Sequence, residues 1–444
     1  MAMTQRERAI LARRWRRFTA AVAAVLVVVV AIAVWPRGGT STTSRAVTES
    51  DVPSASASAA EPSTTTTTTA SVGYPGMPPV VDPSNIYSEI GPKQLSSKHR
   101  TDPPRVYVPN GRSNTVSVID PNTRTVIATF PTGKEPQHVV PAYDLDTLWV
   151  LDNQGNDVIP IDPATGEPGD PLAVDDPYNL YFTPDGASAI VVAEAKRRLD
   201  FRDPHTMELT STLPVPECAG MNHADYSADG SYLLVTCEFA GKVAKIDVAN
   251  QSVLGLLDLT ANPVDGQPLP MAMAMPDGSV SSSMPQDVRA GPDGHHFYVA
   301  DMMAGGVFVV DGDAFAVTKF VATGPGAHGI TPSRDGTQLY IANRGSDQIN
   351  GAPQGPGSVS VLDPASDTVT TTWDVPGGGS PDMGNLNVDG TELWLSGRYD
   401  SEVYVFDTVK GGLAARIPVG SGPHGLTFWP QPGRYSLGHT GNMR

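Results

Sequence analysis

The sequence predicts an all-β protein: a seven-bladed β-propeller of four-stranded antiparallel blades, preceded by an N-terminal transmembrane helix and a disordered stalk. Three observations predict this organisation: an apolar run near the N-terminus, a low-complexity stretch after it, and a repeat through the remainder. The chain has 444 residues, of which 44 are Gly and 41 are Pro, a composition suited to a domain rich in turns. Its two cysteines exclude a zinc module with four thiolates, and its net charge of −17 argues against a nucleic-acid partner.

A basic tail, residues 1–17, precedes an apolar run, residues 18–35. A helix over this run is about 27 Å long, close to the thickness of a hydrocarbon core, and six arginines in the tail favour a cytoplasmic N-terminus. We expect a single-pass membrane anchor, with a cleaved signal peptide and a secreted protein as the competing interpretation. In both cases the rest of the chain lies outside the cytoplasm.

Residues 36–100 are rich in Ser, Thr, Pro and Ala, and residues 64–69 are all Thr. Such a composition buries too little apolar surface to fold. We expect a disordered stalk that holds the following domain away from the membrane.

The rest of the chain repeats one motif, in which a short strand leads to an Asp-Gly turn in five of seven copies. The copies begin at residues 136, 177, 221, 285, 327, 381 and 423. Each copy is followed by two or three further β-rich stretches. A unit of four strands in about 40–45 residues is typical of a propeller blade.

We place the propeller at residues 101–432. It begins with outer strands at 105–130 and ends with an unpaired inner strand at 423–428, so these two pieces must share a blade to close the ring. Residues 433–444 follow as a C-terminal tail for which the repeat gives no role.

The segments 339–343 (LYIAN), 359–363 (VSVLD) and 113–120 (SNTVSVID) resemble the repeat of the YVTN family of β-propellers, which includes YncE-like extracytoplasmic proteins. The resemblance covers residues 105–430. It implies the architecture and leaves activity open, since propellers include binding modules, enzymes and structural proteins.

The start of each inner strand should lie at one mouth of the central channel. The second and third motif positions carry four of the nine histidines and two aspartates from different blades, and Arg344 and Arg398 follow second strands toward the same face. The candidate ligand-binding residues are His138, Asn179, His223, Asp287, His328, Asp382, His424, Arg344 and Arg398. His328 and His424 stand one position before His138 and His223, and adjacent strand residues face opposite sides, so the sequence leaves open whether all four face the channel.

Methionines are expected on the same face. Thioether and imidazole together suit a transition metal such as copper, and the candidate metal ligands are His138, His223, His328, His424, Met271, Met273, Met275, Met302 and Met303. The competing interpretation is that these methionines pack an irregular loop.

Cys218 and Cys237 flank the third inner strand and its partner. Antiparallel pairing brings them to the same end, so we expect a disulfide in an oxidising compartment.

The leading hypothesis is a membrane-tethered binding module whose loop-rich face and channel take an extracytoplasmic protein or small molecule. The alternative is a metal-dependent, copper-using enzyme or metal carrier, and a lactonase-like hydrolase is a weaker third reading that rests on the resemblance alone. The sequence contains none of the common nucleophile, nucleotide or haem-attachment motifs.

Overall fold

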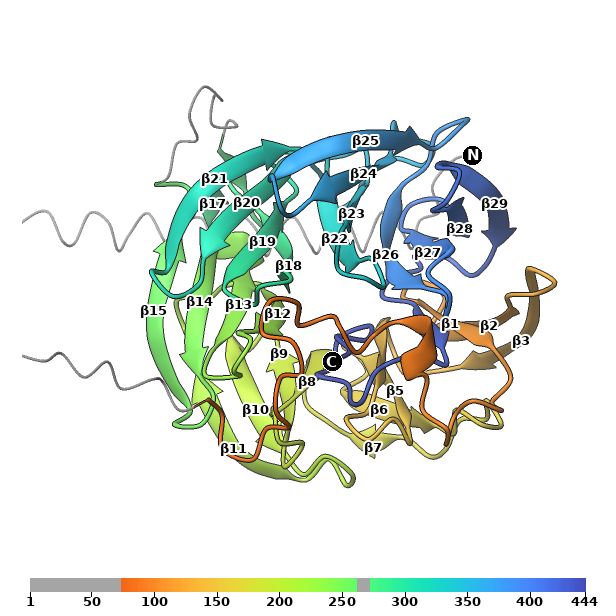
Figure 1. Cartoon of the computed structure of the whole chain (residues 1–444), viewed down its shortest axis with the longest axis horizontal. Helices are drawn as coiled ribbons and strands as arrows, with labels where there is room; N and C mark the ends of the chain where they lie inside the picture. Colours follow the sequence, from red (N-terminus) through yellow and green to blue (C-terminus); the bar gives the residue numbers. More distant parts are fainter. Residues whose placement is uncertain (1–72, 262–271) are drawn as a thin grey trace, which may run out of the picture. The chain divides into compact units, whose positions relative to one another are not determined.

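The computed structural model describes residues 73–261 and 272–444. Within these residues, seven four-stranded antiparallel sheets form a ring around a central channel, as predicted (Figure 1). The inner strands are β4 (Pro136–Pro141), β8 (Pro177–Phe182), β12 (Met221–Tyr226), β18 (Pro285–Ala290), β22 (Ala327–Pro332), β26 (Pro381–Leu386) and β30 (Thr427–Trp429). Six of these begin at the predicted residue.

The other strands of each blade run outward from the channel. The second strands are β5 (Leu148–Asp152), β9 (Ala189–Ala193), β13 (Leu233–Cys237), β19 (His296–Asp301), β23 (Leu339–Asn343), β27 (Glu392–Gly397) and β1 (Arg105–Asn110). The third are β6 (Asp157–Ile161), β10 (Arg198–Arg202), β14 (Lys242–Asp247), β20 (Gly306–Asp311), β24 (Ser358–Asp363), β28 (Glu402–Asp407) and β2 (Thr115–Asp120). The outermost are β7 (Leu172–Ala173), β11 (Leu209–Pro214), β15 (Ser252–Asp258), β21 (Ala316–Ala322), β25 (Thr368–Asp374), β29 (Leu413–Pro418) and β3 (Thr125–Pro131).

The ring closes as the sequence predicts. Strand β30 pairs antiparallel with β1, with Arg105 opposite Trp429 and Tyr107 opposite Thr427, so the first and last parts of the propeller share one blade. This pairing leaves no open edge between the chain's two ends. A small two-stranded sheet, β16 (Met273–Ala274) with β17 (Val280–Ser281), lies in the long insertion before β18.

Apolar side chains pack between neighbouring blades. The inner and second strands are almost entirely buried, as in β8 and β9, whereas the outermost strands expose side chains such as Ile127 on β3 and Leu209 on β11. Val, Ile and Leu occupy both faces of the second and third strands. This is expected, because neighbouring blades cover each sheet on two sides. The core therefore holds the inner strands in fixed positions around the channel.

The expectation of a disordered stalk up to residue 100 is wrong for residues 73–100. This segment, which includes η1 (Pro92–Gln94), packs on the propeller: Ile86, Tyr87 and Ile90 are buried, and the Tyr87 hydroxyl donates a 2.6 Å hydrogen bond to the Ala290 carbonyl. The physical reason is that apolar residues reappear after residue 73, enough to bury a face. The rest of the expected stalk lies outside the described residues.

The predicted anchor at residues 18–35 and the basic tail also lie outside the described residues. In the part of the chain that the structure describes, no helix is long and apolar enough to cross a bilayer.

The C-terminal tail closes the end of the channel at which the inner strands finish. We call residues 436–444 the C-terminal plug. Its backbone bonds to β8, with the Phe182 amide donating to the Leu437 carbonyl and the His439 amide donating to the Leu180 carbonyl. Arg444 is buried and pairs with Asp225 at 2.8 Å. Figure 1 shows the C-terminus within the ring.

Candidate functional site

A β-bulge near the start of the inner strands decides which side chains face the channel. In β4 the register shifts between Pro136 and His138, and in β22 it shifts between Ala327 and Ile330. The same irregularity recurs in β8, β12, β18 and β26. A bulge inserts one unpaired residue, so consecutive side chains no longer alternate strictly between faces.

The bulges answer the question that the sequence left open about the four histidines. All four are fully buried, and they lie close together: the ring centroids of His138 and His424 are 4.8 Å apart, and those of His223 and His328 are 5.9 Å apart. The second motif positions form an upper layer at the mouth, and the third positions form a lower layer inside the channel.

Asp382 organises the upper layer. Its carboxylate accepts hydrogen bonds from Nε of Arg344 and Nδ1 of His424, both at 2.7 Å, and it lies 3.0 Å from Nδ1 of His328. Burial alone would raise the pKa of Asp382, but Arg344 and the two histidines outweigh it and hold this pKa well below its usual range. Asp382 is therefore a buried carboxylate that neutralises Arg344.

The two histidines bound to Asp382 are neutral. Burial lowers the pKa of His328 to about 4, with the Arg344 guanidinium adding to the shift. Burial lowers the pKa of His424 to about 3, although the Asp382 carboxylate opposes the change. With its proton on Nδ1, His424 presents Nε2 as an acceptor to the Tyr178 hydroxyl, 3.4 Å away.

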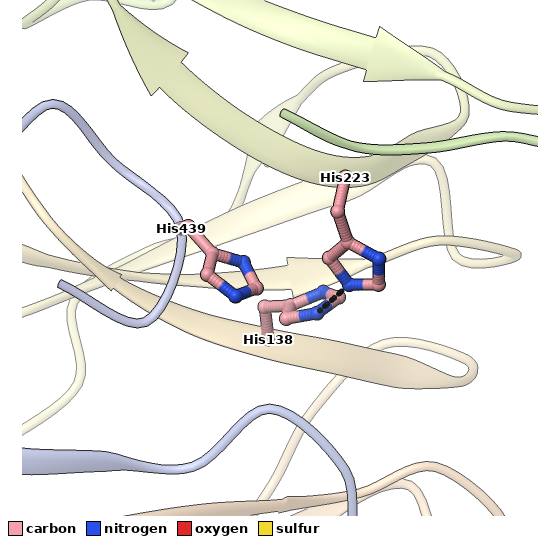
Figure 2. Close-up of side chains that lie close together, drawn as sticks. All are labelled: His138, His223 and His439. Carbon is pink, nitrogen blue, oxygen red and sulfur yellow. Dashed lines mark hydrogen bonds between the residues drawn. The ribbon is translucent and has the colours of Figure 1, made fainter. Parts of the chain in front are cut away.

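The lower layer contains a second histidine group. His138 and His223 approach each other with their Nε2 atoms 3.2 Å apart, and His439 of the C-terminal plug completes the group (Figure 2). One ring nitrogen from each of the three residues lies within 4.8 Å of the other two. Burial is the main cause that holds the pKa of all three imidazoles below the usual range. We call these residues the histidine trio.

Glycine makes room for this packing. A Cβ on Gly425 would lie 2.1 Å from Cδ2 of His138, so only a residue without a side chain lets the segment before β30 pass this imidazole. At Gly329 a Cβ would lie 2.3 Å from the Asp382 carbonyl oxygen, so there glycine lets two neighbouring inner strands approach each other.

The upper layer forms the floor of a cavity of about 480 Å³, which we call the channel pocket. All seven blades contribute to its lining. The lining includes Glu135, Gln137, Tyr178, Glu194, Arg197, Glu238, Asp277, Gln286, His328, Arg344, Arg398 and His424.

Charge in the channel pocket is divided between two walls. Glu135, Glu194 and Glu238 come from three successive blades and form an acidic wall, whereas Arg344 and Arg398 come from the blades across the ring. Burial raises the pKa of Glu194 well above its usual range, with Glu238 adding to the shift, and burial also raises the pKa of Glu238. Within the described residues, neither carboxylate forms an ion pair.

Arg398 is the matching group on the opposite wall. Burial and the neighbouring Arg344 lower its pKa. Its Nη1 donates a 3.5 Å hydrogen bond to the Gly422 carbonyl, and no carboxylate of the described residues pairs with it. Among the described residues, Glu194 and Glu238 on one wall and Arg398 on the other therefore have no ion-pair partner. Arg197 and Asp277, which also line the pocket, pair with each other at 3.1 Å.

The other predicted ligand-binding residues lie in the lower layer. Asn179 donates from Nδ2 to Nδ1 of His439 at 2.9 Å. Asp287 accepts from the Ile330 amide at 2.9 Å and lies 3.4 Å from Arg289. Both residues face the plug side of the floor and do not line the pocket.

The described methionines form a cluster of their own. Met275, Met284, Met302 and Met303 pack together, with Met273 against them. The Met302 sulfur accepts from Nη1 of Arg344 at 3.7 Å, and the Met273 sulfur accepts from Gln348 at 3.4 Å. Met271 lies outside the described residues.

Cys218 and Cys237 are joined by a disulfide within one blade, with their Cα atoms 4.8 Å apart. Cys237 ends β13 next to Glu238, so the crosslink holds the loop that presents this carboxylate to the channel pocket.

Sequence reasoning missed His439 and the role of the acidic wall. His439 lies outside the repeat, so no blade alignment could place it; its one signal is a histidine between two glycines, Gly438 and Gly441, in a tail without β pattern. The convergence of the three carboxylates depends on the ring geometry, which the repeat alone does not give.

Comparison with known proteins supports the architecture. Residues 68–203 match the family model of YNCE-like beta-propellers, and no curated protein matches the chain. Similar solved structures include a functionally unknown protein from Desulfotomaculum acetoxidans (17% identity, 73% of this chain and 98% of that chain, TM-score 0.54). Others are apo AztD from Citrobacter koseri (11% identity, 74% and 98%, TM-score 0.51) and a candidate 6-phosphogluconolactonase from Bacteroides uniformis (16% identity, 74% and 100%, TM-score 0.52).

These identities are low, so the solved structures show a shared fold and nothing about activity. The family match covers β1–β10. The structure shows that the same blade architecture continues through β30 and closes into a ring of seven blades. The chain is therefore a seven-bladed β-propeller, and its residues 68–203 are similar to YNCE-like beta-propellers.

Proposed function

We propose that this protein is a binding module that takes a small zwitterionic molecule in the channel pocket. The observation that carries the proposal is the pair of opposed, uncompensated walls: Glu194 and Glu238 on one side and Arg398 on the other. The cavity volume of about 480 Å³ is in the usual range for small-molecule sites, which favours a small ligand over a folded partner.

The acidic wall supports a cationic group on the ligand. Burial raises the pKa of both carboxyls, and the Glu238 carboxylate adds to the shift of Glu194, so their ionised forms are unfavourable without a cation. An ammonium group between them would relieve the repulsion and favour the ionised carboxylates. Asn222 donates to Glu238 at 2.9 Å and fixes the orientation of that carboxylate.

The basic wall supports an anionic group. Arg398 faces the cavity with one weak backbone contact, and the guanidinium geometry suits a carboxylate or phosphate. The neighbouring Arg344 is already neutralised by Asp382, so Arg398 is the cation available to the ligand. The Tyr178 hydroxyl and the Nε2 atom of His424 add polar contacts at the floor.

Two other functions have less support. A copper site needs thioether sulfur next to imidazole, but the sulfurs of Met302 and Met273 contact Arg344 and Gln348, which favours the loop-packing interpretation. A lactonase-like activity rests on likeness of fold alone, and fold does not carry function. We do not propose either.

We propose that binding takes place outside the cytoplasm, on a domain tethered by residues 18–35. The apolar run, the arginines before it and the Cys218–Cys237 disulfide support this location. Protease treatment of intact cells expressing the full chain should digest the propeller, and protection of the propeller would contradict the proposal.

Calorimetry on the full chain tests the ligand class with three panels: zwitterions such as free amino acids, anions such as dicarboxylates, and cations such as polyamines. We expect a zwitterion to bind about tenfold or more tightly than its singly charged analogues, because each unpaired wall contributes about 1.4 kcal/mol or more. Arg398→Gln and Glu194→Gln should each weaken binding by about tenfold, while Arg100→Gln, an exposed control, should not change it. Equal affinity in the two pocket variants and wild type, or no binding by any panel, would refute the proposal.

A further inference from the structure

The geometry points to a second, separate site: the histidine trio binds one Zn²⁺ ion inside the channel, with the third ligand supplied by the C-terminal plug. The site uses His138, His223 and His439, none of which lines the channel pocket. It does not depend on the proposed function.

The spacing of the first two ligands fits a tetrahedral metal. The Nε2 atoms of His138 and His223 are 3.2 Å apart. Two nitrogens bound at about 2.0–2.1 Å with a tetrahedral angle are separated by about 3.3 Å. The fold therefore holds this pair at the separation that a zinc ion requires.

The orientation of His138 is also that of a ligand. Its Nδ1 lies 2.9 Å from the Tyr178 carbonyl, to which it donates, so the lone pair of the neutral ring is on Nε2. A hydrogen bond from the far nitrogen to a backbone carbonyl is the usual support of a metal-bound histidine. When the ion binds, His223 carries its proton on Nδ1, a buried atom that has no partner among the described residues.

His439 is placed to complete the site. Its ring centroid lies 4.9 Å from that of His223. Without metal its Nδ1 accepts from Asn179 and its Nε2 carries the proton, 3.7 Å from a carboxylate oxygen of Asp287. Zinc binding at Nε2 therefore moves the ring proton to Nδ1 and requires the Asn179 amide to turn its oxygen toward that nitrogen. The nitrogens of the trio extend to 4.8 Å from one another, wider than the tetrahedral spacing, so His439 is the ligand that moves inward on binding. The adjustment is a rotation of the His439 side chain, since the plug backbone on either side is held in place.

The plug holds His439 in place by anchors on both sides. Its φ of 54° is in the left-handed region, which a residue with a side chain keeps only where its surroundings impose it. The hydrogen bond to Leu180 and the Arg444–Asp225 ion pair supply this constraint. A bound ion would connect β4, β12 and the plug, so that metal binding and closure of the channel are coupled.

The other two channel histidines do not belong to the group whose ring nitrogens converge, and they lie in the upper layer that lines the channel pocket. His328 and His424 both lie against the Asp382 carboxylate, which is already paired with Arg344. This difference gives the test a control from the same channel.

The experiment titrates ZnCl₂ into untagged full chain after removal of metal with EDTA, and measures zinc per chain by elemental analysis and affinity by calorimetry. We expect one ion per wild-type chain. His138→Ala, His223→Ala and His439→Ala should each weaken binding by about 100-fold or more, beyond the effect typical of an outer-shell partner. His424→Ala and the exposed control His296→Ala should change it by less than about threefold.

Two wild-type measurements keep the proposal testable if a variant does not fold. Zinc-edge X-ray absorption should show nitrogen or oxygen neighbours at about 2.0 Å and no sulfur at about 2.3 Å. Hydrogen exchange of the backbone amides in residues 436–444 should slow on adding ZnCl₂. Absence of stoichiometric zinc, a sulfur shell, unchanged exchange in the plug, or loss of binding in His424→Ala with none in His439→Ala would each overturn the proposal.

Discussion

Replacing Asp382 by Asn should destabilise the propeller strongly, because it removes the one charge that compensates Arg344. The Asp382 carboxylate accepts from Nε of Arg344 and Nδ1 of His424 at 2.7 Å each, and all three side chains are buried. Removing one partner of a buried ion pair leaves the other charge uncompensated, which costs about 3–5 kcal/mol. We expect Asp382→Asn to lower the free energy of unfolding by that amount.

Urea unfolding of the full chain, followed by tryptophan fluorescence, measures the loss. Asp389→Asn is the matched control, since Asp389 is exposed at the turn of the same blade; it should change stability by less than about 0.5 kcal/mol. Arg344→Met in the Asp382→Asn background should recover part of the loss, giving a coupling of about 2 kcal/mol. A loss below about 1 kcal/mol in Asp382→Asn, or purely additive effects, would refute the electrostatic reasoning.

Three further predictions concern residues around the channel. Gly425→Ala should lower the free energy of unfolding by about 2–4 kcal/mol, because a Cβ 2.1 Å from His138 displaces the ring and breaks its hydrogen bond. Burial raises the pKa of Asp152 to about 7, so the stability that its proton contributes is fully present below about pH 4 and is lost as the pH rises to about 7. Asp152→Asn should therefore remove a loss of stability of about 4 kcal/mol that wild type shows between pH 4 and pH 8, measured by urea unfolding at both pH values. Reduction of the Cys218–Cys237 disulfide should lower the free energy of unfolding by about 2–4 kcal/mol, measured with and without reductant.

Each of these has an outcome that would count against it. For the glycine, Gly255→Ala is the control, since its Cβ would meet nothing nearer than the Phe315 ring at 3.3 Å; equal losses in the two variants would rule out a specific clash with His138. A pH profile unchanged by Asp152→Asn would show that this carboxyl does not bind the proton. An unfolding midpoint insensitive to reductant would show that the crosslink does not constrain the unfolded chain.

Much of the fold follows from local pattern. Alternating Val, Ile and Leu recur in the blades and Asp-Gly turns in five of the seven, so six inner strands begin at the expected residue. Closure by β30 follows from counting strands: a final inner strand without partners must join the first outer strands. Four of the channel histidines could be predicted for the same reason, since equivalent positions of a repeat meet at the channel.

What could not be predicted depends on contacts outside the repeat. Residues 73–100 show neither strand nor helix periodicity, and they are ordered because the propeller offers a face to Ile86 and Tyr87. His439 reaches the channel because the Arg444–Asp225 ion pair anchors the C-terminal tail. The sequence repeat does not predict this ion pair. The bulges in β22 and β4 insert one extra residue, so that both His328 and His138 face the channel. A prediction from strictly alternating side chains does not include such bulges.

The most direct test of the account identifies what the channel pocket retains. The untagged full chain would be purified from its own cells, and any small molecule released on denaturation would be identified by mass spectrometry and quantified per chain. We predict one molecule that carries both a positive and a negative group, retained by wild type and absent from Arg398→Gln and Glu194→Gln. A retained molecule of single charge, or equal retention by all three proteins, would contradict the claim that the two walls act together.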